Sequence, residues 1–100
     1  MSGYTRSARR ERETVDNLRR LGHCAYRTPA SKGAADVIDL YRGEIVLVQI
    51  KTGGTSPYSH FGPSDRQRLL DEAASAGGRA LLFWYPPNKP LQIIESDQWP

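Results

Sequence analysis

The feature that most constrains the fold is a run of four consecutive apolar residues, Ile45–Val48, inside the segment 44–51. A strand that buries one face alternates apolar and polar residues, whereas this segment is apolar on both faces. It therefore predicts a central strand that other elements cover on both sides.

The remaining segments are separated by glycine and proline residues, which mark turns and helix ends. A helix over 7–21 is indicated by apolar residues at helical spacing, namely Ala8, Val15, Leu18 and Leu21. A second helix is expected from Ser64, with a capping box to Gln67, to the pair Gly77-Gly78. Strands are expected at 23–27, 35–41, 44–51, 79–85 and 91–95. The order α-β-β-β-α-β-β predicts one α/β domain over residues 1–100.

The charge of the chain is uneven along its length. Residues 1–34 contain eight Lys and Arg against three acids, whereas residues 35–100 contain six bases and eight acids. A basic first third favours a polyanionic partner, most simply a nucleic acid, although a solvated basic helix would have the same composition.

The single cysteine, Cys24, excludes an internal disulfide. No apolar stretch approaches the roughly 20 residues of a membrane span, and the first residues do not have the pattern of a secretory signal. We therefore expect a cytoplasmic protein that does not associate with membranes.

Three positions place polar side chains where the pattern predicts burial, and the first is Glu11. It lies three residues after Ala8 and four before Val15, which puts it on the apolar stripe of the first helix. Glu13 is about 200° away around the helix and should face solvent. A carboxylate on a buried face needs a cationic partner, which a metal ion or an arginine can supply.

The second position is an aspartate at the start of the strand over 35–41. Asp36 shares a face with Ile38, and Asp39 lies on the opposite face with Val37. Residue alternation alone leaves both aspartates as candidates for a functional site.

The third position is the end of the central strand. Gln49 and Lys51 share one face because they are two residues apart, and Ile50 lies opposite. Two polar side chains that finish an otherwise apolar strand are typical of the edge of an active site, although a strand emerging into solvent also ends this way.

Taken in order, these residues resemble the archaeal-type Holliday junction resolvases of the PD-(D/E)XK superfamily, over nearly the whole chain. The similar segments are Glu11-Arg12-Glu13, Arg27 with Ser31-Lys32, Asp36-Val37-Ile38, Gln49-Ile50-Lys51, and the stretch 61–83. The resemblance implies a restriction-endonuclease-like mixed sheet with helices on its faces. It also favours Asp36 over Asp39, and Glu11 over Glu13.

The resemblance further implies a metal-dependent endonuclease that resolves four-way DNA junctions. Catalysis is assigned to Glu11, Asp36, Gln49 and Lys51. A Mg²⁺ ion, with Mn²⁺ as a substitute, is assigned to Glu11, Asp36, Gln49 and the backbone carbonyl of Ile50. DNA contacts are assigned to Arg12, Arg27, Ser31 and Lys32, and a homodimer would carry two active sites.

One residue departs from the family pattern, because Gln49 stands where these enzymes usually have glutamate. An amide oxygen can bind a hard cation but brings no negative charge, so metal affinity should fall. Two alternatives therefore stay open: a nuclease of this superfamily that acts on other branched or duplex DNA, and a non-catalytic DNA-binding module of the same fold.

Overall fold

The apolar run lies in β3 (Glu44–Thr52), the middle strand of a five-stranded sheet. The computed structural model describes residues 2–28 and 34–100. The other elements are α1 (Ser2–Arg20), β1 (Cys24–Arg27), β2 (Val37–Tyr41), α2 (Pro63–Ala76), β4 (Arg79–Tyr85), β5 (Gln92–Glu95) and a short 3₁₀ helix, η1 (Ser96–Gln98).

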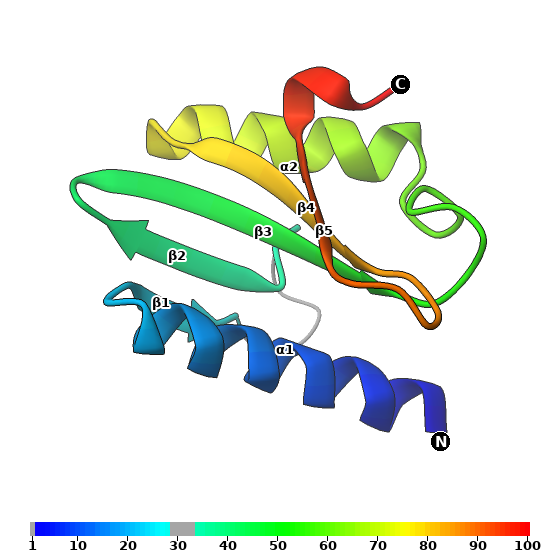
Figure 1. The fold of residues 1–100 in the computed structure, drawn as a ribbon. Helices are drawn as coiled ribbons and strands as arrows, with labels where there is room; N and C mark the ends of the chain where they lie inside the picture. Colours follow the sequence, from blue (N-terminus) through cyan, green and yellow to red (C-terminus); the bar gives the residue numbers. More distant parts are fainter. Residues whose placement is uncertain (1, 29–33) are drawn as a thin grey trace.

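The strands lie in the order β1-β2-β3-β4-β5, and α1 and α2 lie on opposite sides of the sheet (Figure 1). β3 and β4 are parallel and are connected through α2, while the other neighbouring strands are antiparallel. The prediction of a mixed sheet with helices on its faces, in the order α-β-β-β-α-β-β, is confirmed.

Each face of β3 belongs to a different hydrophobic cluster. Val46, Val48 and Ile50 pack with Val15 and Leu18 of α1. Leu47 packs on the other side, in a cluster with buried residues of α2 and β4, namely Leu69, Ala73, Ala80 and Leu82. The two-sided apolar pattern of this strand is therefore explained by one helix on each face.

α1 begins at Ser2, five residues before the predicted start, and ends at Arg20. The prediction that Leu21 belongs to the buried stripe was wrong: the helix ends before Leu21, whose exposed fraction is 70%. Thr14 is buried instead, and its hydroxyl donates to the carbonyl of Arg10 and hydrogen-bonds the hydroxyl of Tyr85 at 2.6 Å. Within the described residues, no helix has the length and apolar character needed to cross a membrane.

The predicted capping box of α2 was also wrong. The helix begins at Pro63, its N-cap is Gly62, and no side chain caps it, because Ser64 already lies in the first turn. The predicted end at Gly77-Gly78 is confirmed. Gly77 has a φ of 72°, in the left-handed region that glycine adopts without strain. Gly78 lies so close to β3 that a Cβ atom there would overlap the carbonyl of Ile45.

Candidate active site

The candidate site lies where β2 and β3 separate. β2 begins at Val37, opposite Val48, so the last residues of β3 have no β2 partner. Asp36 lies directly before β2, and its backbone N–H donates to the carbonyl of Val48 at 2.8 Å. Its side-chain Oδ2 accepts the N–H of Ile50 at 2.8 Å. The carboxylate of Asp36 therefore accepts the N–H of Ile50 in place of a backbone carbonyl of β2. This hydrogen bond fixes the position of the carboxylate beside β3.

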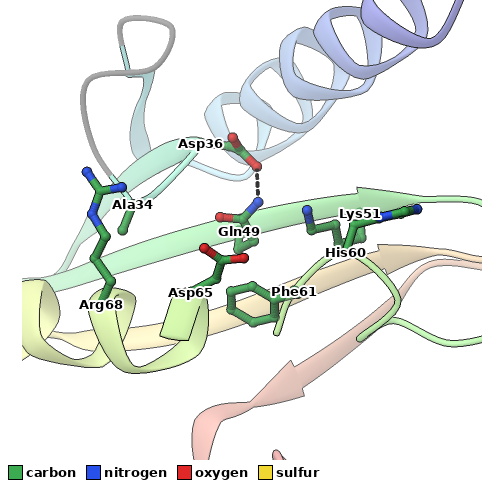
Figure 2. A pocket seen from close by; sticks show the side chains of 8 residues that line it. All are labelled: Ala34, Asp36, Gln49, Lys51, His60, Phe61, Asp65 and Arg68. Carbon is green, nitrogen blue, oxygen red and sulfur yellow. Dashed lines mark hydrogen bonds between the residues drawn. The ribbon is translucent and has the colours of Figure 1, made fainter. Parts of the chain in front are cut away.

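Gln49 is the second residue of the site and lies beside Asp36 (Figure 2). Its Nε2 donates to the same Oδ2 at 2.9 Å. Because a carboxylate oxygen accepts and does not donate, the amide must present its NH₂ group to Asp36. The Oε1 atom, which is the only side-chain atom of Gln49 that can bind a cation, is directed away from this oxygen.

These residues form one wall of a pocket with a volume of about 260 Å³. Lys51 belongs to the same wall, since it shares a face of β3 with Gln49. The opposite wall comes from α2 and the residues before it (Figure 2). The residues that complete the lining are Ala34, His60, Phe61, Asp65 and Arg68.

The surroundings of Asp36 raise the pKa of its carboxyl group from 3.8 to about 6. Burial is the main cause, because it penalises the charged form, and the negative charge of Glu11 adds to it. The hydrogen bond from the Ile50 N–H, and the charges of Lys51 and Arg27, lower the pKa without compensating fully. A cation bound near Asp36 would stabilise its charged form.

Glu11 lies on α1 and does not line this pocket. Its side chain is 18% exposed, and its Oε1 accepts from Arg27 Nη2 at 3.0 Å. Glu13 is more exposed and pairs with Arg9 and Arg10 along the helix. The stripe therefore separated the two glutamates correctly, and the cationic partner of Glu11 in this structure is an arginine. Its role as a metal ligand stays a prediction.

Asp39, the alternative to Asp36, lies on the α1 face of the sheet and is 6% exposed. The Nδ1–H of His23 donates to its two carboxylate oxygens at 2.9 and 2.8 Å. The His23 ring also stacks on Tyr41, with ring centroids 3.9 Å apart. The carboxylate of Asp39 is thus occupied by a structural contact and does not line the pocket.

The residues predicted to contact DNA are described only in part. Arg12 is exposed on α1 and forms no ion pair with any residue in 8–28 or 34–100. Arg27 is partly exposed and pairs with Glu11. Ser31 and Lys32 lie outside the described residues. All four assignments stay predictions.

The helix wall of the pocket was missed from the sequence, although one signal was present. Asp65 lies four residues before Leu69 and eight before Ala73, both of which are buried against the sheet. The spacing that places Glu11 on the stripe of α1 likewise places Asp65 on the stripe of α2, although Asp65, unlike Glu11, is exposed at the open end of that stripe. Arg68 gave no comparable signal: it pairs with Glu72 at 3.6 Å, and Glu72 accepts the N–H of Ala34.

The donor set suits a hard divalent cation, although it is sparse. Within the described part of the chain, no three His, Cys, Asp or Glu residues form a group that could hold a metal ion. The pocket does contain the carboxylates of Asp36 and Asp65 and the amide of Gln49. Mg²⁺ binds through oxygen ligands and commonly uses one or two carboxylates together with water. The residues present fit that mode of binding.

Comparisons with known proteins support the fold independently. A sequence model of the archaeal Holliday junction resolvase (Hjc) family matches residues 2–99. Hjc from Archaeoglobus fulgidus, a Holliday junction resolvase from an archaeal hyperthermophile, matches in structure with a TM-score of 0.72 and 15% sequence identity. The match covers 90% of this chain and 72% of that chain. No curated protein sequence matches the chain significantly.

Proposed function

The chain belongs to the archaeal Holliday junction resolvase family, and from that premise we propose that it resolves four-way DNA junctions by metal-dependent hydrolysis of phosphodiester bonds in the pocket of Figure 2. The observation that carries this proposal is the grouping of Asp36, Gln49 and Lys51 in one pocket at the end of β3. These are the positions at which the family pattern places its catalytic groups.

The proposed cofactor is Mg²⁺, with Mn²⁺ as a substitute. Asp36, the side-chain oxygen of Gln49 and the backbone carbonyl of Ile50 would hold it, with Glu11 as a further direct or water-mediated ligand. The bound cation would lower the pKa of a water molecule and neutralise charge on a phosphate oxygen. For Glu11 to take part, its carboxylate would have to leave or share its contact with Arg27.

Lys51 is the proposed partner of the reacting groups. It lines the pocket and forms no ion pair among the residues the structure describes, so its ammonium group is available. A positioned ammonium can orient the attacking water or stabilise the negative charge that develops on the phosphate. Lys51→Ala would remove whichever of these tasks Lys51 performs.

The proposed substrate contacts are electrostatic. Arg12, Arg27, Ser31 and Lys32 would bind the phosphate backbone, so binding should weaken steeply with salt. A homodimer would present two copies of the pocket and cut opposing strands of the junction. This activity would take place in the cytoplasm.

The test is cleavage of a substrate panel in Mg²⁺: a four-way junction, a flap, a nicked duplex and a plain duplex. Wild type should cut the junction preferentially, and Asp36→Ala and Lys51→Ala should each lower the cutting rate severely. Asp71→Ala is the matched control, since Asp71 is exposed on α2 and lies outside the pocket. Equal cleavage of plain duplex would instead favour a nuclease for other DNA substrates.

A second candidate function is favoured by the contact between Gln49 and Asp36. The amide satisfies one carboxylate oxygen without any cation, as a non-catalytic DNA-binding module would require. Such a module would bind the junction tightly and leave it uncut even in Mn²⁺. Cutting by the wild type in Mn²⁺ separates the two functions. Gln49→Glu should preserve or raise that cutting, and a clear loss would mean that the ligand assignment at position 49 is wrong.

A further inference from the structure

We propose that Asp65 supplies the carboxylate that position 49 lacks, as a direct or water-mediated ligand of the divalent cation in this pocket. The inference rests on the proposed function, since it concerns the same site. Asp65 lines the pocket from α2, across from the wall formed by Asp36 and Gln49 (Figure 2).

The direction of α2 carries Asp65 toward the pocket. Asp65 lies in the first turn, on the same stripe as Leu69 and Ala73, which are buried in the cluster between α2 and the sheet. Its side chain therefore projects toward the sheet, beyond the end of the packed cluster. Asp65 is exposed to solvent at the mouth of the pocket that it lines.

The backbone that leads into α2 is held by several contacts. Phe61 is 1% exposed and packs edge-on against Trp99, with ring centroids 5.1 Å apart. Arg66 Nη1 donates to the carbonyl of Phe61 at 2.7 Å, and the Arg66 N–H donates to the carbonyl of Gly62. A ligand on a rigid element keeps its geometry, so Asp65 is suited to such a role.

Gln49 leaves the pocket short of one negative charge. Its NH₂ group faces Asp36, so Asp36 and Gln49 do not direct their oxygens to one cation unless the amide turns. Asp65 forms no hydrogen bond or ion pair through its side chain with the residues at 8–28 and 34–100. A second carboxylate in the same pocket adds a negative charge that balances a divalent cation, and the neutral amide of Gln49 cannot supply it.

The competing explanation is purely local. An aspartate in the first turn stabilises a helix by interacting with its dipole, and this needs no metal. That role predicts a loss of stability on substitution that is the same with and without a cation. The two explanations therefore differ in metal binding.

The experiment is Mn²⁺ titration of the full chain, followed by electron paramagnetic resonance and by calorimetry, with no DNA present. Asp65→Asn should weaken Mn²⁺ binding by about tenfold or more, given that even groups behind a metal ligand account for about 10–100-fold. Asp71→Asn is the control on the same helix and should bind Mn²⁺ as wild type does. In the Asp65→Asn background, Gln49→Glu should restore binding.

The outcomes separate this inference from the proposed function. If Asp36→Ala weakens Mn²⁺ binding and Asp65→Asn does not, the inference is wrong and the metal site stands without Asp65. If neither substitution changes Mn²⁺ binding, both the inference and the metal-dependent function are overturned. A variant that loses binding must also keep the wild-type circular dichroism spectrum, and Gln49→Glu rescue shows that a folded site was recovered.

Discussion

Asp36 and Asp39 are three residues apart in the chain and lie in opposite environments. Asp39 is buried on the α1 face, where His23 binds its two oxygens. Asp36 lines the pocket between β3 and α2, where its Oδ2 accepts two N–H groups. Among the described residues, no cationic side chain forms an ion pair with it. The same residue type therefore stabilises the fold at one position and stays available for chemistry at the other.

These two aspartates show how one β-strand can hold a structural residue and a candidate functional residue close together in the chain. Successive residues alternate between faces, so an odd spacing sends two aspartates to opposite sides of the sheet. Asp39 lies inside β2, among packed residues, and requires an internal partner. Asp36 lies just outside the strand, where β2 and β3 separate and a pocket opens. Asp39 is buried and both of its oxygens are bound by His23, whereas Asp36 is partly buried beside a pocket and only its Oδ2 is bound.

The largest expected effect is on junction cleavage. Asp36→Ala should lower the cleavage rate by on the order of a hundredfold or more, because loss of a metal ligand exceeds the about 10–100-fold cost of losing a group behind one. Asp39→Asn should retain cleavage per folded molecule, since Asp39 does not line the pocket. Single-turnover rates on a labelled four-way junction measure both. If both variants lost cleavage rate to a similar extent, Asp36 could not be assigned a role in the reaction that Asp39 does not have.

The next largest effect is on the free energy of unfolding, and here the Asp39 substitution should do more damage than the Asp36 substitution. Asp39→Ala should lower the free energy of unfolding by about 2–4 kcal/mol, because it leaves His23 without its partner and a gap in a packed region. Asp36→Ala should cost less, since its carboxylate borders an open pocket. Urea unfolding followed by circular dichroism gives both values. A greater loss for Asp36→Ala would mean that its bonds to β3 are the main structural contact.

A smaller effect concerns pH. The pKa of Asp36 is raised from 3.8 to about 6, so the folded state holds this proton more tightly than the unfolded state. The resulting stability is fully present below about pH 4 and is lost as pH rises through 6. Asp36→Asn does not titrate and can still accept both N–H groups. Without metal, it should exceed wild type by about 1–2 kcal/mol at pH 8, after allowance for partial exposure, and by nothing near pH 4.

The measurement is thermal unfolding of the two proteins in chelator across this pH range. An advantage for Asp36→Asn that did not change between pH 4 and pH 8 would rule out a titration of Asp36 as its cause. Addition of Mn²⁺ should reverse the order of the two proteins at pH 8, because only wild type retains the anionic ligand.

The smallest effect tests whether Glu11 belongs to the environment of Asp36. Its negative charge contributes to the raised pKa of Asp36, although its carboxylate contacts Arg27. Glu11→Gln should therefore lower the pKa of Asp36 and leave its hydrogen bonds intact. Carboxyl ¹³C shifts of Asp36 through a pH titration report this change. An unchanged titration would place Glu11 outside the electrostatic reach of the pocket.

The fold was largely predictable because its signals are local. The apolar run in β3 required two covered faces, and the glycines after α2 marked its end. The errors were local as well. The stripe was extended to Leu21, one residue beyond the helix, and Ser64 was taken as a cap although Pro63 already begins α2. Helix ends depend on the competition between neighbouring residues, which periodicity does not resolve.

The site was predictable only in part. Position and spacing identified Gln49 and Lys51 as neighbours on one face of a strand, and the pocket contains both. Asp65 and Arg68 belong to the same pocket but lie 14 or more residues further along the chain. No spacing rule connects a helix residue to a strand residue at that separation.

By itself, the sequence determined the order of the elements, the two-sided burial of the central strand and the faces on which its polar residues lie, because each depends on residues a few positions apart. Only the tertiary structure decided which aspartate is occupied by His23, which amide atom of Gln49 faces Asp36, and that α2 brings Asp65 to the pocket. Those outcomes depend on contacts between segments that meet only after the chain has folded.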